Sequence, residues 1–340
     1  MKYTSAGVLS ASADASLKLW DPKYVAEAVC TMTPSAKKGK KAIAIVGLDA
    51  QQNALRPEFA ITCTLDSVVS RFSLLQDSLG KEEASWTSDT SGSKMYGQAW
   101  AISIHPDPSS SLFATSGLGG QIRLLSSNVA NFGEAKSSIP SRGEFAQCSF
   151  SPDGRLLASA TSEGQIALFD SETGQLVQYW TAHAGNIRSA TFSPDSSLII
   201  TGGDDKQINV FDIRGIATSK DPSQNGGTSS IRSRHSRAGQ HVANLAGHTG
   251  WVLSLSCKND GRMFASSSSD GTIKLWDLAR PASGCVGTLR DHEADVWAVD
   301  WAPVVQSSNA VEGISGASLG GGSLISGGRD GIIRWWRGTG

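Results

Sequence analysis

The chain has 340 residues, of which 39% are hydrophobic and 18% are charged, a composition that can bury a sizeable core and excludes extensive disorder. Its formal net charge of -1 at pH 7 provides no global field for binding nucleic acid or an anionic membrane. The five cysteines are scattered and form no CxxC pair, which excludes a typical disulfide framework or zinc site. We therefore expect a soluble intracellular protein with no cofactor and no metal.

A motif of fixed spacing recurs along the chain. In its complete form, Ser or Thr is followed by Asp four positions later and by an aromatic residue six positions after that, as in Ser266, Asp270 and Trp276. Self-similarity at fixed spacing indicates a repeat architecture. We predict a single domain over residues 1–340, built from seven units that end near residues 21, 74, 127, 170, 212, 277 and 337.

The first unit, up to residue 21, is short. Met1 stands just before its turn, so we expect the unit to lack an inner strand and to leave an open edge in the structure. Later units are preceded by an additional strand pattern that ends in a turn, over residues 145–154, 187–196, 252–261 and 296–303. Each complete unit therefore predicts an inner strand followed by two strands joined at the Asp turn.

Residues 215–241 interrupt the repeats between the fifth and sixth units. Their Ser, Gly, Asn and Arg content is too polar for a core, so we predict a flexible, solvated insertion loop. We interpret residues 75–97 and 304–322 as similar insertions. The basic run RSRHSR in the first of these loops is more typical of a solvated loop than of an RNA site, and we expect no direct nucleic-acid partner.

The units resemble the WD-repeat family. They carry its Gly-His pair at Gly247-His248 and its Trp-Asp pair at Trp276-Asp277 and Trp20-Asp21. The resemblance covers nearly the whole chain and implies an all-β, seven-bladed WD-repeat β-propeller, with the first blade incomplete at the N-terminus.

The resemblance also implies a hydrogen-bonded chain of side chains within each blade. Donors and acceptors alternate along such a chain, so every buried polar group can be satisfied. The two complete sets are His248, Ser266, Asp270 and Trp276, and His292, Ser326, Asp330 and Trp336. A shorter set consists of His183, Thr201 and Asp205, with Phe211 where a tryptophan would stand. Hydrolase triads use the same residue types, but the spacing recurs and neither Ser266 nor Ser326 stands in a G-x-S-x-G motif, so we predict no enzyme activity.

Residues just before the inner strands and just before the turn aspartates should gather at one face of the ring. This predicted partner-binding face consists of Trp100, Glu144, Asn186, Arg188, Asp204, Trp251, Asp295, Trp297 and Arg329. Trp and Arg are enriched at the energetic centres of protein interfaces. The alternative is that the tryptophans fill the inner ring of the core, and for Trp100 and Trp297 the two readings are evenly balanced.

Residues 183–212, 245–277 and 289–303 resemble the WD-repeat subunit of the superkiller (Ski) helicase complex, in a fungal-type form. This resemblance implies a non-catalytic, cytoplasmic and also nuclear subunit that binds a tetratricopeptide-repeat scaffold and an RNA helicase. It would support exosome-mediated 3′ to 5′ mRNA decay, and meiotic recombination as well. The alternative functions are a general WD-repeat adaptor, such as a ubiquitin-ligase substrate receptor or signalling scaffold, and a propeller hydrolase.

Overall fold

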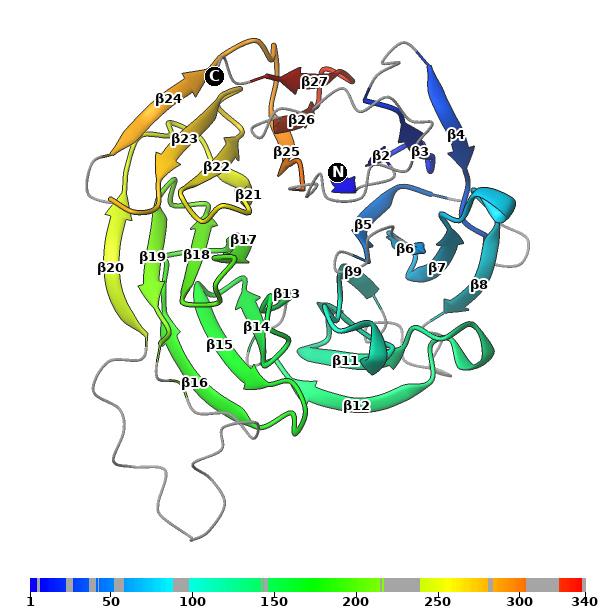
Figure 1. Cartoon of the computed structure of the whole chain (residues 1–340). Coiled ribbons are helices and arrows are strands. Elements are labelled where there is room, and N and C mark those ends of the chain that lie inside the picture. The colour runs from blue at the N-terminus through cyan, green and yellow to red at the C-terminus, as the bar shows by residue number, and fades with distance from the viewer. Residues whose placement is uncertain are drawn as a thin grey trace, which may run out of the picture.

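A computed structural model describes residues 1–4, 7–22, 27–36, 41, 43–51, 58–87, 98–141, 143, 146–214, 216, 239–280, 284–303 and 324–337. These residues form seven antiparallel sheets, six of four strands and one of three. The sheets are arranged around a common axis as the blades of a ring (Figure 1). The fold is an all-β, seven-bladed propeller, as the repeats predicted.

The first three blades run from the inner strand to the outer strand in chain order. Blade 1 contains β1 (Lys2–Thr4), β2 (Gly7–Ala11), β3 (Leu17–Trp20) and β4 (Ala28–Met32). Blade 2 contains β5 (Ile45–Ala50), β6 (Phe59–Thr64), β7 (Val68–Ser73), the 3₁₀ helix η1 (Gln76–Ser78) and β8 (Glu82–Thr87). Blade 3 contains β9 (Gln98–Ile104), η2 (Pro108–Ser110), β10 (Leu112–Leu118), β11 (Gln121–Ser126), η3 (Val129–Asn131) and β12 (Ala135–Pro140).

The remaining four blades follow the same order. Blade 4 contains β13 (Ala146–Phe150), β14 (Leu156–Thr161), β15 (Gln165–Asp170) and β16 (Leu176–Thr181). Blade 5 contains β17 (Ile187–Phe192), β18 (Leu198–Gly203), β19 (Ile208–Asp212) and β20 (Gln240–Leu245). Blade 6 contains β21 (Val252–Cys257), β22 (Met263–Ser268), β23 (Ile273–Asp277) and β24 (Cys285–Leu289). Blade 7 contains β25 (Val296–Trp301), β26 (Leu324–Gly328) and β27 (Ile333–Trp336).

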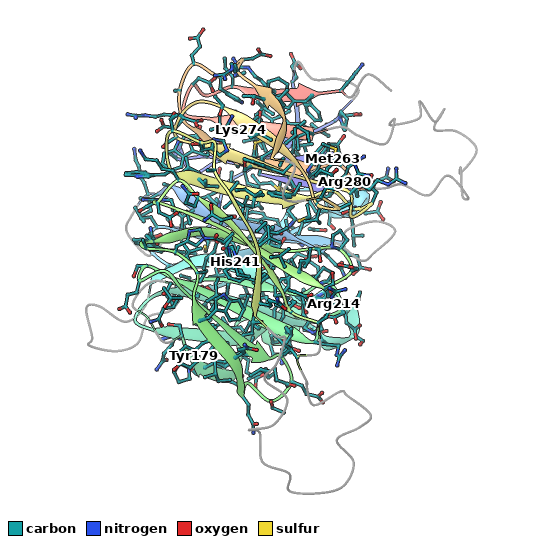
Figure 2. The ribbon with its side chains drawn as sticks, turned by 90° about the vertical axis from the view of Figure 1, so that its left-hand side faces the viewer. Tyr179, Arg214, His241, Met263, Lys274 and Arg280 are labelled. Atoms are coloured by element: carbon teal, nitrogen blue, oxygen red, sulfur yellow. The ribbon has the colours of Figure 1, made fainter. Side chains whose placement is uncertain are left out.

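Burial changes from the middle of a blade to its rim because each sheet is stacked between two neighbouring sheets. Every residue of β14 is buried, since both of its faces are covered. The outer strand β12 is mostly exposed. In the edge-on view, Tyr179 of β16 and His241 of β20 lie on the outer surface (Figure 2).

The prediction that the first blade lacks its inner strand was wrong. β1 pairs with β2 from Lys2↔Leu9 to Thr4↔Gly7. Two carboxylates from the flanking blades hold this short strand: Asp49 Oδ1 lies 3.1 Å from Lys2 Nζ, and Asp300 Oδ2 accepts the Tyr3 backbone N–H at 2.8 Å. This strand is too short to show an apolar pattern in the sequence, and polar contacts with both neighbouring blades hold it in place.

The ring closes through packing between the first and last blades. Tyr3, Val8 and Ile325 are buried together at this interface. The Tyr3 ring meets the Trp335 ring edge-on, with centroids 6.0 Å apart. Blade 7 has three strands among the described residues, and Trp335 belongs to the outermost of these, β27. The prediction of an open ring was therefore wrong, because blade 1 packs against blade 7.

Two of the three proposed insertions overlap with strands of the blades. Residues 75–97 include η1 and the outer strand β8, and residues 88–97 lie outside the described residues. Likewise, β20 already begins at Gln240. Most of the predicted loop at 215–241, and residues 304–322, lie outside the described residues.

Candidate functional site

The polar networks lie inside blades 6 and 7. His248 Nδ1 is 2.9 Å from Asp270 Oδ2, and His248 Nε2 is 2.7 Å from Ser266 Oγ. The Trp276 indole N–H donates to the same Ser266 Oγ at 2.8 Å. Because a carboxylate can only accept, Nδ1 carries the imidazole proton and Nε2 accepts from the serine hydroxyl. Each of the four side chains in this network therefore has a hydrogen-bond partner.

Blade 7 repeats this arrangement. The corresponding distances are 2.8 Å from His292 Nδ1 to Asp330 Oδ2, 2.7 Å from His292 Nε2 to Ser326 Oγ and 2.8 Å from Trp336 Nε1 to Ser326 Oγ. Arg334 Nη1 adds an ion pair to Asp330 Oδ2 at 2.7 Å. The sequence analysis had not assigned Arg334 to this set, although its position four residues after Asp330 was a visible signal.

The acidic members of both sets are stabilised in their charged form. Burial by itself raises the pKa of Asp270, but hydrogen bonds from His248, Thr272 and the Thr249 backbone outweigh it and hold that pKa well below its usual range. For Asp330, burial is likewise outweighed by bonds from the Ile332 backbone N–H, His292 and Arg334, which lower its pKa to about 2. Both carboxylates are therefore ionised acceptors at neutral pH.

In blade 5 the network is shorter. His183 Nδ1 lies 2.9 Å from Asp205 Oδ1, and His183 Nε2 lies 2.8 Å from Thr201 Oγ1. Phe211 offers no N–H, so the chain of hydrogen bonds ends at Thr201, whose hydroxyl is 3.4 Å from the Asn209 carbonyl. Blade 5 therefore has the His–Asp and His–Thr hydrogen bonds but lacks the indole donor of blades 6 and 7.

The buried position of these residues argues for a structural role. Ser266 and Ser326 have no exposed surface, and each already accepts an indole N–H. A hydrolase serine must be reachable by a substrate carbonyl, with its oxygen free to attack. Neither serine meets that requirement.

The predicted partner-binding residues that the structure describes lie at strand starts and turns on one face of the ring, which we call the start face. It consists of the residues at which inner strands begin and of the turns between second and third strands. A backbone hydrogen bond joins these two segments in the same way in several blades. It runs from Asp204 N to Asn186 O at 2.9 Å, from Ser269 N to Trp251 O at 3.0 Å, and from Arg329 N to Asp295 O at 2.8 Å.

A β-bulge near the start of five inner strands sets the direction of one side chain in each. The register of β17 with β18 shifts between Ile187 and Ser189, which leaves Arg188 as the extra residue. The same shift leaves Trp100 on β9 and Trp297 on β25 as extra residues. Because a bulge breaks the alternation of the strand and re-aims a side chain, three of the predicted residues share one structural position.

Arg188, Asp204 and Trp251 form a cluster across blades 5 and 6. The Arg188 guanidinium carbon lies 4.6 Å from the centre of the Trp251 ring, a cation–π distance. Both Nε and Nη2 of Arg188 bond to the Asp204 carboxylate, the latter at 3.1 Å. Asp204 thus fixes Arg188 against the indole ring, while Trp251 remains 48% exposed.

The other predicted residues are less closely associated. Trp297 is 53% exposed, so the core-filling alternative does not apply to it. Arg329 Nη1 is 3.8 Å from Asp295 Oδ2, and Arg329 is largely in solvent. Trp100 is half-buried, and Glu144 lies outside the described residues.

Four exposed apolar residues of the start face were missed by the sequence analysis. They are Ile43, Val46, Leu65 and Ile332. Alignment of the turns contained the signal for Leu65, which precedes Asp66 as Arg329 precedes Asp330. No such signal existed for Val46, since its exposure depends on the bulge between Ile45 and Gly47.

A hollow of about 230 Å³ lies away from the start face, between blades 2 and 3. Among its lining residues, Arg71 pairs through Nε with Glu83 Oε2 at 2.8 Å and stacks 3.6 Å from the centre of the Phe59 ring. His105 Nε2 lies 3.1 Å from the Gly154 carbonyl. The Arg71 contacts thus lie within blade 2, and the His105 contact joins blades 3 and 4.

The described part of the chain contains neither a membrane-spanning helix nor a metal-binding cluster. No helix there is long and apolar enough to cross a membrane. No group of three or more His, Cys, Asp or Glu side chains there is placed to hold a metal ion.

The fold is a seven-bladed β-propeller, and blades 5 to 7 carry the repeated polar networks. Residues 142–170, 174–212, 239–277 and 283–337 match the WD domain, G-beta repeat family. These four matches and the seven blades together support membership of the WD-repeat family.

Similar curated proteins have diverse names. The LEC14B protein of Lithospermum erythrorhizon is 28% identical over 179 residues, which are 52% of this chain and 34% of that protein. The nuclear distribution protein PAC1 of Meyerozyma guilliermondii is 31% identical over 107 residues, 29% of this chain and 21% of that protein. A guanine nucleotide-binding protein subunit beta of Oryza sativa is 46% identical over 59 residues, 17% of this chain and 15% of that protein. The alignments therefore span about a third or less of these relatives.

Proposed function

We propose that this protein is a non-catalytic scaffold that binds other proteins through its start face. The observation that carries this proposal is the cluster of Arg188, Asp204 and Trp251, in which a half-exposed indole is held beside a fixed guanidinium. A rigid aromatic side chain loses little conformational entropy on binding, and Trp and Arg are the residues most enriched at interface hot spots. The buried polar networks support the scaffold role, because they stabilise blades and do not reach solvent.

The more specific proposal is a WD-repeat subunit of the superkiller helicase complex, located in the cytoplasm and also in the nucleus. It rests on the resemblance of residues 183–212, 245–277 and 289–303, which include the Arg188 and Trp251 positions. In this role the start face binds the tetratricopeptide-repeat scaffold or the RNA helicase and thereby supports exosome-mediated mRNA decay. A general WD-repeat adaptor is the second candidate, because the matched relatives have names unrelated to that complex.

The experiment that separates these two candidates is affinity purification of the tagged full chain from its native cells. A helicase and a tetratricopeptide-repeat protein are the expected partners for the superkiller role. Cullin-type ligase subunits or kinases as the stoichiometric partners would instead establish an adaptor of another pathway. Purification with no stoichiometric protein partner would contradict the scaffold proposal itself.

We predict that Trp251→Ala weakens partner binding by at least about 2 kcal/mol, roughly 30-fold in Kd, because it removes an interface anchor. Arg188→Glu should have a similar effect, since it also destroys the pair with Asp204. Titration calorimetry with the purified partner measures the affinity, and circular dichroism checks the fold. Val286→Ala is a matched control, because Val286 is 53% exposed but lies on the rim strand β24.

A further inference from the structure

Exposed apolar side chains are unevenly distributed over the propeller. Among the described residues, those on the start face are Ile43, Val46, Leu65, Trp251, Trp297 and Ile332. The others lie on rim strands or on loops at the opposite face. Exposed apolar residues are ordinary when they are scattered singly, but their collection on one face marks an interaction surface.

The apolar residues of the start face fall into two groups. The first group lies on blades 6 and 7 and includes Trp251, Trp297 and Ile332. The second group lies on blade 2 and consists of Ile43, Val46 and Leu65, which we call the blade-2 patch. Val46 and Leu65 are each 42% exposed, close to the 48% of Trp251.

The blade-2 patch is built by the same local geometry as the tryptophan group. Leu65 N donates to Ala44 O at 2.9 Å, the equivalent of the bond from Ser269 N to Trp251 O. Val46 is the extra residue of the bulge in β5, as Trp297 is in β25. Val46 and Trp297 are therefore equivalent positions of different blades, and Leu65 takes the position of Ser269, beside that of Trp251.

The Trp100 backbone lies close to Gly47, the residue that follows Val46 of the blade-2 patch. A Cβ atom at Gly47 would come within 3.1 Å of the Trp100 carbonyl oxygen, so the two inner strands approach closely at this point. Trp100 is itself a bulge residue, on the neighbouring blade.

The arginines of the start face are already neutralised within it. Arg188 is paired with Asp204, and Arg329 is paired with Asp295. An acidic ligand would have to compete with these aspartates, and a basic one with the arginines. Uncharged apolar groups meet neither obstacle, and they match the exposed indoles and aliphatic side chains.

We propose that the start face binds a single uncharged segment of a partner protein at two apolar positions. One aliphatic or aromatic residue of the segment contacts Trp251 and Trp297, and a second contacts Val46 and Leu65. This inference rests on the proposed scaffold function and assigns the blade-2 patch as its second half. Because the contacts are apolar, the affinity depends little on salt, unlike that of charge-steered complexes.

The test uses a phage library of random peptides of about 12 residues, selected on the purified full chain. Selected peptides should carry two separated apolar residues and few charges, and their Kd should change less than about twofold between about 50 and 500 mM NaCl. Leu65→Glu and Trp251→Glu should each weaken the best peptide at least about tenfold. Val286→Glu on the rim is the matched control and should leave the affinity unchanged, with circular dichroism verifying each fold.

Different failures separate this inference from the proposed function. If Trp251→Glu abolishes binding and Leu65→Glu does not, the two-position inference is wrong and the scaffold proposal stands. Charged or strongly salt-dependent peptides also overturn the inference alone. If no peptide is selected, or neither variant weakens binding, both the inference and the start-face proposal fail. Self-association that Leu65→Glu abolishes in sedimentation would show that a second copy occupies the face, which overturns the inference.

Discussion

At the scale of single residues, the buried hydroxyl groups of the repeats determine how polar groups are satisfied. Ser266 joins His248 to Trp276 because its oxygen accepts the indole N–H while its own hydrogen is donated to the imidazole. Removal of such a shared partner leaves two buried groups unpaired, and an unpaired buried group costs more than the lost bond.

We predict that Ser266→Ala lowers the free energy of unfolding by about 2–4 kcal/mol, the cost of two unsatisfied buried groups. Ser10→Ala is the matched control. Ser10 accepts only the Trp20 indole N–H, at 2.8 Å and in a half-buried position, so about 1 kcal/mol is expected. Urea unfolding of both variants measures the difference. Equal losses of unfolding free energy in the two variants would show that the hydrogen bond between Ser266 and His248 adds no stability.

The pH dependence of stability follows from the pKa of Asp270. Since this pKa is lower in the folded state than the usual unfolded value of about 3.9, ionised Asp270 stabilises the fold above about pH 4. The contribution disappears as the pH falls further towards the folded pKa. We predict that Asp270→Asn is less stable at pH 7 and loses less stability between about pH 4 and pH 2. Urea titrations across that range measure the two slopes, and parallel slopes would contradict the prediction.

At the scale of structural elements, the turns between second and third strands connect one blade to the next. The Gly164 carbonyl, in the turn after β14, accepts the backbone N–H groups of Ala182 at 2.8 Å and His183 at 3.1 Å. Gly164 has a φ of +79°, and an added Cβ would lie 2.1 Å from the His183 carbonyl oxygen. This turn can hold the next blade so closely only because it has no side chain.

We therefore predict that Gly164→Ala lowers the free energy of unfolding by more than about 2 kcal/mol, from backbone strain and a backbone clash together. Gly261→Ala separates the two causes. Gly261 has a φ of +68° but nothing within 4 Å of an added Cβ, so only strain of about 1 kcal/mol applies. Thermal and urea unfolding measure both variants. A smaller effect at Gly164 than at Gly261 would rule out the clash.

At the scale of the whole molecule, neighbouring inner strands are tied together by side chains of one blade that accept backbone N–H groups of the next. These bonds include Ile104 N to Asp49 Oδ2 at 2.8 Å, Phe150 N to Ser103 Oγ at 3.0 Å, Ala190 N to Gln147 Oε1 at 3.1 Å and Leu255 N to Ser189 Oγ at 3.0 Å. Asp300 continues this series across the closing interface. It accepts Tyr3 N and also the Ser256 hydroxyl, at 2.7 Å.

We predict that Asp300→Ala lowers the free energy of unfolding by about 1–3 kcal/mol, because the Tyr3 N–H and the Ser256 hydroxyl lose their shared acceptor. Amide exchange should accelerate in β1 before it does so in blade 4. Tyr3→Phe is the control. The Tyr3 hydroxyl has no hydrogen-bond partner among the described residues, so its loss should change stability by less than about 0.5 kcal/mol. Unchanged exchange in β1 would show that apolar packing alone closes the ring.

The sequence by itself determined the all-β repeat architecture, the number of blades and the members of the polar networks. These features depend on residue types at fixed spacing, and His248, Ser266, Asp270 and Trp276 meet wherever the strands pair in register. The residues of the start face were also predictable in part, because turn and strand-start positions can be aligned.

Only the tertiary structure decided how the ring closes and which side chains the start face exposes. The three-residue strand β1 forms because Asp49 and Asp300 reach it from residues far away in the sequence. Val46 and Trp297 are exposed because a bulge breaks the alternation of their strands. Neither effect has a local pattern, since one depends on contacts between blades and the other on pairing with a second strand.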